Sequence, residues 1–332
     1  MIRVAMLSYW HVHAWDYTRQ AQSHPDVTIG AVWDETPNRG RAAAEKLGVP
    51  FYESLNDLLV SAEIDAVIVD APTSMHRDVM VAAARAGKHI FTEKVLAPTL
   101  AEVDQIIAAT DQANVVLTVS LPQLSAGYLR AIDDLIAGGV LGDVTLVRTR
   151  MAHNGALRTE QNPDGWLPPH FYDPEQCGGG AMIDLGCHPM YLAHHILGLP
   201  ETVSAQYGFV TGRAVEDNAV VTLSYPNGAI AVVEAGFVTP ASPFTVEVHG
   251  THTSLVYTAP PPVLRVRRAD GWVEKEIPKS SPLPFAQWVD HIQRGVRHTA
   301  NIQAARALTM LMEAANRSAH TRRQVRIDSH QS

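Results

Sequence analysis

The sequence predicts an α/β protein in which an N-terminal doubly wound parallel sheet is followed by a C-terminal α+β domain with a mostly antiparallel open sheet. Over residues 1–120, short apolar segments alternate with amphipathic segments of helical period, which is typical of a parallel sheet between helices. After residue 200, strand patterns follow one another through short turns, as in an antiparallel sheet. A chain of 332 residues is long enough for two domains, which we expect to span residues 1–121 and 122–332.

In the N-terminal domain, the predicted strands are short runs rich in Val and Ile. The expected strands are residues 3–7, 27–34, 66–69, 89–93 and 115–119. The expected helices are residues 15–23, 39–47, 55–61, 75–86 and 100–113. Ligands of doubly wound sheets bind beyond the carboxyl ends of the strands, so the loops after residues 7, 34, 70 and 92 should carry the function.

The C-terminal domain should open with a helix at 128–137 and a strand at 143–152. A loop rich in Trp, Pro and Gly then fills residues 154–180. The further expected strands are residues 202–211, 219–225, 229–237, 244–250, 254–258, 263–268 and 272–277. Helices at 284–294 and 301–319 end the domain, and one face of the sheet should pack against helices.

The composition is that of an ordinary globular protein. Apolar residues make up 46% and charged residues 18% of the chain, with no block of like charge. A net charge of -8 argues against a nucleic-acid surface. Neither a signal peptide nor a membrane span is expected, and Cys177 and Cys187 are too few for a disulfide framework. We therefore expect a cytoplasmic protein with no nucleic-acid or membrane partner.

The loop after the first strand, Ser8–Ala14, stands where a glycine-rich phosphate-binding loop belongs. On the pattern G-x-G-x-x-G, its three glycine positions hold Ser8, Trp10 and His13. Taken alone, it is a strand–helix turn packed by two aromatic side chains. Backbone N–H groups at a helix start and the helix dipole still favour an anion. A non-glycine residue at positive φ costs on the order of 1–3 kcal/mol, so a dinucleotide site here would differ in shape from the glycine version.

Polar residues follow the next three strands. Asp34 ends the second strand, where an acid can accept hydrogen bonds from an adenosine ribose, although Asp also commonly starts a turn. In the third loop, Ser74 can cap the next helix and His76 falls in its first turn. In the fourth, Glu93 is followed by Lys94, which is either a solvated residue or an ammonium aimed at a substrate oxygen.

The stretch Gly178–Tyr191 carries a candidate acid–base pair. Its three leading glycines allow positive φ and a close backbone approach. Asp184 and His188 lie on one helix face if the helix has begun by Asp184. A helix N-terminus disfavours the imidazolium, which suits a general base. The alternative is that Asp184 is a cap and His188 a satisfied buried residue.

The run Ala84–Lys94 together with Asp184–His188 resembles the glucose–fructose oxidoreductase / inositol dehydrogenase (Gfo/Idh/MocA) family. That family carries the motifs A-G-K-H-V-x-x-E-K-P and G-G-G-x-x-x-D-x-G-x-H, and the resemblance covers essentially the whole chain, including Val215–Ala219 and Glu313–Ser318. It implies an N-terminal Rossmann domain that binds NAD or NADP and a second domain for substrate and subunit contacts. Members oxidise a hydroxyl or reduce a ketone on sugars, polyols and related small molecules. A homodimer or homotetramer is implied.

Position by position, the resemblance implies three catalytic residues. Lys94 matches the lysine that holds the reacting oxygen, Asp184 the carboxylate that orients substrate and imidazole, and His188 the general acid/base. Asp34 matches the ribose-binding acid and favours NAD over NADP, because a carboxylate repels a 2′-phosphate. The implied cofactor pocket consists of Ser8, Tyr9, Trp10, His11, Val12, Asp34, Ala71, Pro72, Thr73, His76, Glu93 and Lys94.

Three departures from the family pattern bear on these roles. Val95 replaces the proline that follows the motif lysine, which affects the Lys94 turn. The missing glycine fingerprint affects cofactor affinity. The start of the second domain, Ser120–Gly127, lacks the family's arginine, so substrate preference does not carry over.

The loop 154–180 is the expected substrate lid. Trp166 either stacks on a sugar face or packs at the domain junction. Gln123, His153 and His170 are further candidate substrate ligands. No metal site is expected, because none of the histidines and cysteines considered has metal-ligand spacing: His153, His170, Cys177, His188, His194 and His195.

These observations predict an NAD(P)-dependent oxidoreductase acting on CH–OH groups of a sugar, polyol or related compound. One alternative is redox-neutral chemistry, in which a tightly held NAD assists a hydrolase or epimerase acting on a sugar derivative. The other is a cofactor-free sugar-binding or regulatory relative, which only the glycine-free loop supports.

Overall fold

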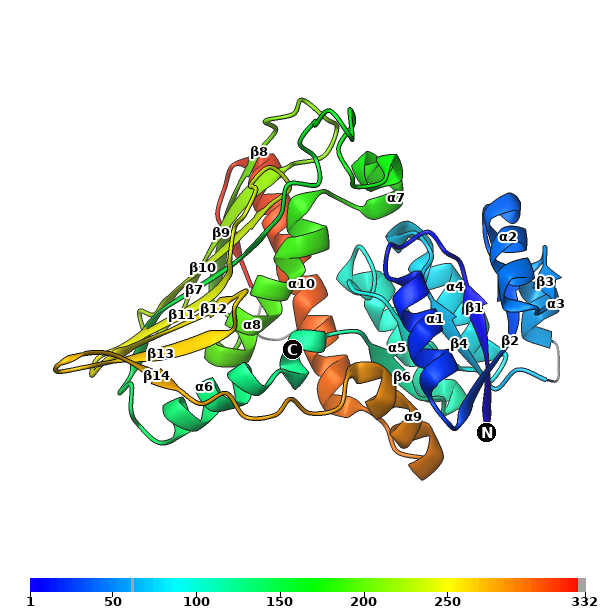
Figure 1. Ribbon diagram of the computed structural model, residues 1–332, viewed down its shortest axis with the longest axis horizontal. Coiled ribbons are helices and arrows are strands. Elements are labelled where there is room, and N and C mark those ends of the chain that lie inside the picture. The colour runs from blue at the N-terminus through cyan, green and yellow to red at the C-terminus, as the bar shows by residue number, and fades with distance from the viewer. Residues whose placement is uncertain (61–62, 328–332) are drawn as a thin grey trace. The chain divides into compact units, whose positions relative to one another are not determined.

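The computed structural model describes residues 1–60 and 63–327, and the chain divides into two compact units (Figure 1). Unit 1 comprises Met1–Leu121 together with Pro282–Arg306. Unit 2 comprises Pro122–Ser281 and the chain from Ala307 onward. The expected domain boundaries placed all of 122–332 in the second domain. Residues 282–306 instead belong to unit 1, because Phe285 and Trp288 pack in its core.

Unit 1 is built on a six-stranded, wholly parallel sheet in the order β3-β2-β1-β4-β5-β6. Its strands are β1 Ile2–Leu7, β2 Val27–Trp33, β3 Phe51–Tyr52, β4 Ala66–Val69, β5 His89–Thr92 and β6 Leu117–Val119. Its helices are α1 Ala14–Ser23, α2 Pro37–Leu47, α3 Leu55–Val60, α4 His76–Arg85, α5 Leu100–Ala113 and α9 Pro284–Arg294. The strand order reverses between β1 and β4, so the loops after these two strands border the crevice where such sheets bind ligands.

Local sequence signals set several helix ends in unit 1. Pro37 occupies the start of α2, and Gly48 ends that helix in the left-handed conformation at φ 67°. Before α5, the hydroxyl of Thr99 accepts the N–H of Glu102 at 3.3 Å while the Glu102 carboxylate accepts the N–H of Thr99 at 3.2 Å, a reciprocal capping box. The expected cap from Ser74 is not formed, because α4 begins at His76 without a side-chain cap.

Two aromatic residues of α9 explain why residues 282–306 belong to unit 1. Phe285 and Trp288 are 2% and 0% exposed, and their rings lie 5.4 Å and 5.6 Å from the ring of Phe91 on β5. They join the same apolar core as β1, β2 and β4. Asn301 adds a polar link, since its side-chain amide accepts the Val119 N–H at 2.7 Å and donates to the Val119 carbonyl at 2.8 Å.

Unit 2 contains a nine-stranded sheet in the order β14-β13-β12-β11-β7-β10-β9-β8-β15. Its strands are β7 Val144–Ala152, β8 Thr202–Gly208, β9 Asn218–Ser224, β10 Ile230–Gly236, β11 Phe244–Gly250, β12 Ser254–Ala259, β13 Val263–Arg268, β14 Gly271–Lys275 and β15 Val325–Arg326. Strands β7 and β10 run parallel, and the other pairs formed by the described residues are antiparallel. Its helices are α6 Gly127–Ala137, α7 Pro174–Cys177 and α8 Cys187–Leu197, of which α8 packs on β7 and β10.

The predicted fold class is confirmed: a parallel Rossmann sheet is followed by a mostly antiparallel one. Helix α10, Thr299–Thr321, begins in unit 1 and ends in unit 2. The two-residue edge strands β3 and β15 were not predicted, and Ser61, expected in the helix 55–61, lies outside the described residues. Within the described ranges, no helix combines the length and apolar character that a membrane crossing requires.

Candidate functional site

The loop between β1 and α1 adopts a glycine-like conformation without glycine. Ser8 has φ 79°, in the left-handed region where a non-glycine residue is strained by about 1–3 kcal/mol. Its hydroxyl accepts the N–H of Trp10 at 3.0 Å, and its own N–H donates to the carbonyl of Trp33 at 2.7 Å. The loop therefore keeps the tight first turn of a phosphate-binding loop, with hydrogen bonds from both the backbone and the hydroxyl of Ser8.

Most backbone N–H groups of the same loop already have acceptors within unit 1. Tyr9 N donates to Asp34 Oδ2 (2.9 Å), His11 N to the carbonyl of Asp70 (3.1 Å) and His13 N to His11 Nδ1 (3.2 Å). Across residues 8–13 of the described chain, the N–H of Val12 is the one left without an acceptor. Val12 is 42% exposed and precedes α1, so its N–H and the start of that helix are the groups that fit an anionic diphosphate.

Asp34 is buried at the carboxyl end of β2, and its carboxylate is fully engaged. Its oxygens accept N–H groups from the backbone of Tyr9 (2.9 Å) and Thr36 (2.7 Å). The guanidinium of Arg39 binds both oxygens, at 2.9 Å and 2.8 Å, and also pairs with Glu35. Since the side chain of Arg39 is 28% exposed, a ligand approaching this end of β2 meets an arginine–aspartate pair.

Glu93 and Lys94 follow β5 and are both buried. The Glu93 carboxylate accepts the N–H of Lys94 at 2.9 Å and the hydroxyl of Tyr17, which also lies 2.7 Å from Ser120 Oγ. Burial alone would raise the pKa of Glu93, but the positive charges of His11 and Lys94 outweigh it and hold the pKa at about 2. Glu93 is therefore ionised although it is buried inside unit 1.

His76 connects the loop after β4 to the turn after Lys94. Its Nδ1 lies 3.0 Å and 3.2 Å from the carbonyls of Val95 and Leu96, and its Nε2 lies 3.1 Å from the carbonyl of Ala71. Burial lowers the pKa of His76. Because both ring nitrogens face backbone carbonyls, the side chain holds these two loops together.

The other residues predicted to line the cofactor pocket lie in the same group of loops. Ala71, Pro72 and Thr73 are buried immediately after β4. Beside them, His11, His13 and Glu93 bring three ligand-type atoms within 4.8 Å of one another. Neither His11 nor His13 was among the histidines considered for a metal from the sequence, although the spacing H-x-H was visible.

In unit 2, Asp184 lies in a π-helical turn, Met182–Gly186, that runs directly into α8. Such turns are rare and are frequent at functional sites. The glycines before it are required by geometry: Gly178 and Gly179 have φ 75° and 155°. The buried carboxylate of Glu216 accepts the N–H groups of Gly180 and Met182, a role that was not predicted.

His188 is 9% exposed in the first turn of α8, and its Nδ1 lies 3.0 Å from the hydroxyl of Tyr191. That hydroxyl also accepts the N–H of Gln123 at 3.1 Å. The Gln123 side chain is itself bonded to the hydroxyl of Tyr128 at 3.0 Å. Tyr191 was not predicted as a site residue, and its three-residue spacing from His188 on a helix is the signal that identifies it.

The candidate lid residues come from different segments of the chain. The His153 ring stacks on Phe237 (5.0 Å, 8°) and lies 4.6 Å from the ring of Trp166, which is 48% exposed and bonded to Asn154 through its indole N–H at 3.1 Å. Burial lowers the pKa of His153 against an opposing effect of Asp184, so these two side chains interact electrostatically. His170 is in the short turn Pro169–Tyr172, where its ring lies 5.1 Å from that of Phe171.

A family match decides how these residues are to be interpreted. Residues 6–121 match the oxidoreductase family with an NAD-binding Rossmann fold, and residues 129–256 match the Gfo/Idh/MocA C-terminal domain. The chain belongs to the Gfo/Idh/MocA family. The resemblance inferred from the two motifs is therefore confirmed.

Gfo/Idh/MocA relatives with named activities act on sugars and polyols. The 1,5-anhydro-D-fructose reductase of Ensifer adhaerens is 30% identical over 236 residues, 69% of this chain and 67% of that protein. The myo-inositol 2-dehydrogenase of Thermotoga maritima is 30% identical over 216 residues, 63% of this chain and 61% of that protein. The matched regions thus span about two thirds or less of these relatives. This chain is an oxidoreductase of CH–OH groups with an NAD(P)-binding Rossmann domain.

Solved structures of several oxidoreductases share the whole fold. The aldose–aldose oxidoreductase from Caulobacter crescentus has a TM-score of 0.81 at 23% identity, covering 98% of this chain and 99% of that one. A levoglucosan dehydrogenase solved with NADH and L-sorbose has a TM-score of 0.83 at 19% identity, covering all of both chains. A 3-ketoreductase from Actinomadura kijaniata, solved with NADP, has a TM-score of 0.81 at 21% identity, covering 96% and 97%. At these identities the likeness establishes the fold.

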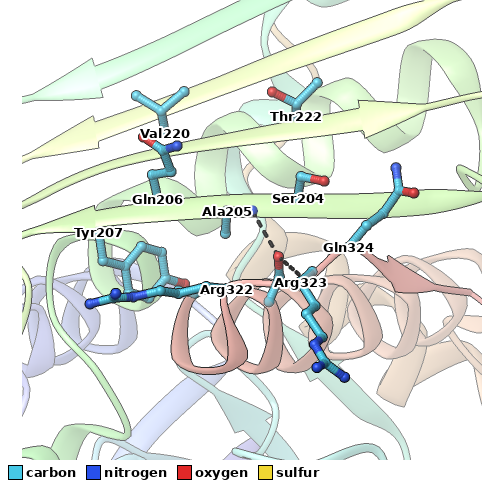
Figure 2. A pocket seen from close by; sticks show the side chains of 11 residues that line it. Ser204, Ala205, Gln206, Tyr207, Val220, Thr222, Arg322, Arg323 and Gln324 are labelled. Atoms are coloured by element: carbon cyan, nitrogen blue, oxygen red, sulfur yellow. Dashed lines mark hydrogen bonds between the residues drawn. The ribbon is translucent and has the colours of Figure 1, made fainter.

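A cavity of about 640 Å³ opens in unit 2 beside β8 and the end of α10 (Figure 2). Hydroxyl, amide and guanidinium groups line much of it, among them Ser204, Thr222 and Arg323. The hydroxyl of Ser318 accepts the Ala205 N–H at 3.0 Å and donates to the Arg323 carbonyl at 2.7 Å, which joins the helix end to the strand. None of the residues predicted to bind cofactor or substrate lines the described part of this cavity.

Proposed function

We propose that this protein transfers hydride between NAD and a hydroxyl-bearing or ketone carbon of a sugar, polyol or related small molecule. The observation that carries the proposal is the way His188 is held. The π-helical turn of Asp184 leads directly into its helix, and its Nδ1 has a fixed partner in Tyr191. A histidine fixed at one ring nitrogen presents the other in a defined direction, as a general acid/base requires.

We assign Lys94, Asp184 and His188 the roles that the family resemblance implies. When bound, the nicotinamide would take up or supply the hydride. The Lys94 ammonium would hold the reacting oxygen and stabilise its developing negative charge, and Asp184 would orient the substrate. His188 Nε2 would take the hydroxyl proton during oxidation and return it during reduction.

The proposed role of His188 needs one particular tautomer, and the contact with Tyr191 is compatible with it. Nε2 can accept a proton only if Nδ1 carries the other one, so Nδ1–H must donate to the Tyr191 oxygen. That oxygen has two lone pairs, and the Gln123 N–H uses one. The remaining lone pair serves the imidazole, both before and after Nε2 has taken up its proton.

For the cofactor, we propose NAD rather than NADP. The residues that would hold it are Ser8–Val12, Asp34 and Ala71–Thr73, at the carboxyl ends of β1, β2 and β4. The Val12 N–H would serve the diphosphate and Asp34 the adenosine ribose. Since Arg39 already occupies both Asp34 oxygens, a ribose would share that carboxylate with the guanidinium.

For the substrate, we propose contacts from Gln123, His153, Trp166 and His170. Trp166, at 48% exposed, offers an aromatic face to a sugar. We also propose a homodimer or homotetramer formed through the open face of the unit 2 sheet. On that face Val220 and Ile230 are 42% and 41% exposed, on strands whose alternate residues are buried.

The proposal is tested with purified protein and a panel of aldoses, polyols and their ketones, by following NADH absorbance. Lys94→Ala and His188→Ala should each lower turnover by at least about a hundredfold while the protein stays folded. Lys275→Ala and His252→Ala, both exposed in unit 2, are matched controls that should keep full activity. Retained activity in either site variant would refute its catalytic role.

Two further measurements separate the alternatives. Calorimetric titration with NAD⁺ and NADH should show binding, or the purified protein should release nucleotide on denaturation. Absence of both at millimolar concentration would favour the cofactor-free relative. Turnover of a sugar derivative without net change in NADH, by a protein that retains nucleotide, would favour the redox-neutral enzyme.

A further inference from the structure

The loop that replaces the glycine-rich sequence brings two histidines to a buried glutamate. His11 and His13 lie between β1 and α1, and Glu93 follows β5. One ligand-type atom from each lies within 4.8 Å of the others. His11 and Glu93 have side chains only 6% and 2% exposed, whereas that of His13 is 46% exposed, so the group is buried on one side and open on the other.

The residue types form a familiar metal-binding set. Two imidazoles and a carboxylate, with a further position open to water or a ligand, are typical of zinc and of other divalent transition metals. With bonds of about 2.1 Å and tetrahedral angles, the ligand atoms would be separated by roughly 3.4 Å. Since the three ligand atoms lie within 4.8 Å of one another, the side chains need to contract by less than about 1.5 Å around an ion. His11 Nδ1, which is 4.0 Å from Glu93 Oε1, would exchange the His13 N–H that it accepts at 3.2 Å for the metal.

Each of two ligands also has the outer partner that metal sites use. His13 Nδ1 lies 2.8 Å from Asp16 Oδ2, which fixes the ring and leaves Nε2 for a metal. Glu93 accepts the Tyr17 hydroxyl on Oε1 and the Lys94 N–H on Oε2, which fixes the carboxylate. Histidine ligands of metal centres often donate their other ring N–H to a carboxylate.

A neighbouring buried carboxylate gives an independent reason for a cation here. Asp70 is 0% exposed, and neither of its side-chain oxygens has a hydrogen-bond partner among the described residues. Its carbonyl accepts the N–H of His11 at 3.1 Å, so it lies beside the group. An uncompensated buried carboxylate is costly: protonation of Asp70 is one way to avoid that cost, and a cation nearby is another.

We propose that His11, His13 and Glu93 bind a divalent transition metal of the zinc class. The ion would be coordinated by protein side chains on one side and would keep an open position toward the exposed His13 side of the loop. The metal titration needs neither NAD nor substrate, although His11 also belongs to the segment Ser8–Val12 that we propose for the cofactor. A new ligand site thus occupies the segment where the glycine fingerprint is missing.

The test uses full-length protein stripped with EDTA and titrated with ZnCl2 by calorimetry, and with CoCl2 by visible absorption. The expected result is one equivalent bound per chain, with cobalt d–d bands typical of a low-coordinate site. His13→Asn, an exposed substitution that should not impair folding, should weaken binding at least tenfold. Asp16→Asn should weaken it by about tenfold or more through the His13 ring. His252→Asn, in unit 2, is the matched control and should bind like the unmodified protein.

Three results would overturn the proposal. The first is that the unmodified protein binds zinc no more tightly than His13→Asn does. Another is stoichiometric binding that Asp16→Asn, His13→Asn and Glu93→Gln all leave unchanged, which would place the ion elsewhere. The third is a cobalt spectrum of the fully hydrated ion. Because only the metal is titrated, these results do not test the catalytic roles of Lys94 and His188.

Discussion

Both carboxylate oxygens of Glu216 lie 3.0 Å from the backbone nitrogen of Gly180. Oε1 also accepts the N–H of Met182 at 2.9 Å, and the Glu216 carbonyl accepts the N–H of Ala181 at 2.8 Å. A Cβ at position 180 would lie 2.1 Å from that carbonyl oxygen, so only glycine fits. The turn that carries Asp184 is therefore fixed by one buried acid from elsewhere in the chain.

Glu216→Ala should destabilise the protein markedly. It leaves the N–H groups of Gly180 and Met182 without acceptors, at about 1–3 kcal/mol for each buried donor. Glu216→Gln keeps one acceptor oxygen and should cost less. Urea unfolding measures both, with Glu274→Ala as a control, since Glu274 forms an exposed pair with Arg265 and its loss should stay within about 0.5 kcal/mol. Equal effects of Glu216→Ala and Glu274→Ala would contradict this role.

Substitutions of Asp34 and Arg39 should move cofactor preference in opposite directions. Arg39→Ala leaves the Asp34 charge uncompensated, so the ratio of kcat/KM for NAD to that for NADP should rise several-fold. Asp34→Ala frees the guanidinium, and the ratio should fall. Arg265→Ala, which removes an exposed pair with Glu274 in unit 2, is the control. An unmodified protein that already prefers NADP would refute the assignment of Asp34 and point to Arg39 or Arg41 as the phosphate partner.

Mild acid should destabilise unit 1 through His298. Burial lowers the pKa of His298 from 6.5 to about 4, and His291, stacked at 4.3 Å, acts in the same direction. The unfolded chain then binds more protons between these values, so the free energy of unfolding should fall as the pH drops from 6.5 toward 4 and level off below. In His298→Gln, the decrease in the free energy of unfolding over this pH range should be smaller. Urea midpoints at about pH 7.5 and about pH 5 measure it, and parallel curves for the two proteins would contradict the prediction.

Trp288→Ala should show that α9 completes the core of unit 1. Trp288 is 0% exposed among Phe91 and Phe285, and removing such a side chain costs about 3–5 kcal/mol. Trp272→Ala, at a site 49% exposed on β14, should cost little by comparison. Thermal and urea unfolding provide the comparison. A Trp288→Ala protein as stable as Trp272→Ala would show that the aromatic group contributes little to unit 1.

The sequence was sufficient for most elements because their signals are local. Buried runs such as Ala66–Val69 and the capping residues around α2 and α5 are visible within a few positions. The strained loop was also anticipated, and Ser8 does adopt positive φ. The two-residue strands β3 and β15 are too short to show the alternation of apolar and polar residues by which strands are predicted.

Contacts between distant segments explain what the sequence left out. Arg39 lies only five residues after Asp34, yet the sequence does not tell whether its side chain turns toward that carboxylate. Nothing near Gly180 points to Glu216. The same holds for Phe91 with Phe285 and Trp288, which placed the α9 segment in the other unit. Side-chain direction and packing decide these pairs, and a single sequence records neither.

The division of unit 1 into two chain segments has a consequence for biosynthesis. Its sheet is encoded by residues 1–121, yet its core also needs Phe285 and Trp288, and β6 also needs Asn301. On the ribosome, residues 1–121 emerge long before Phe285 and Trp288, because residues 122–281 of unit 2 lie between them in the chain. Until then, part of the apolar surface of the first segment stays uncovered. A nascent chain halted soon after residue 121 would carry that uncovered surface and be a natural client for chaperones.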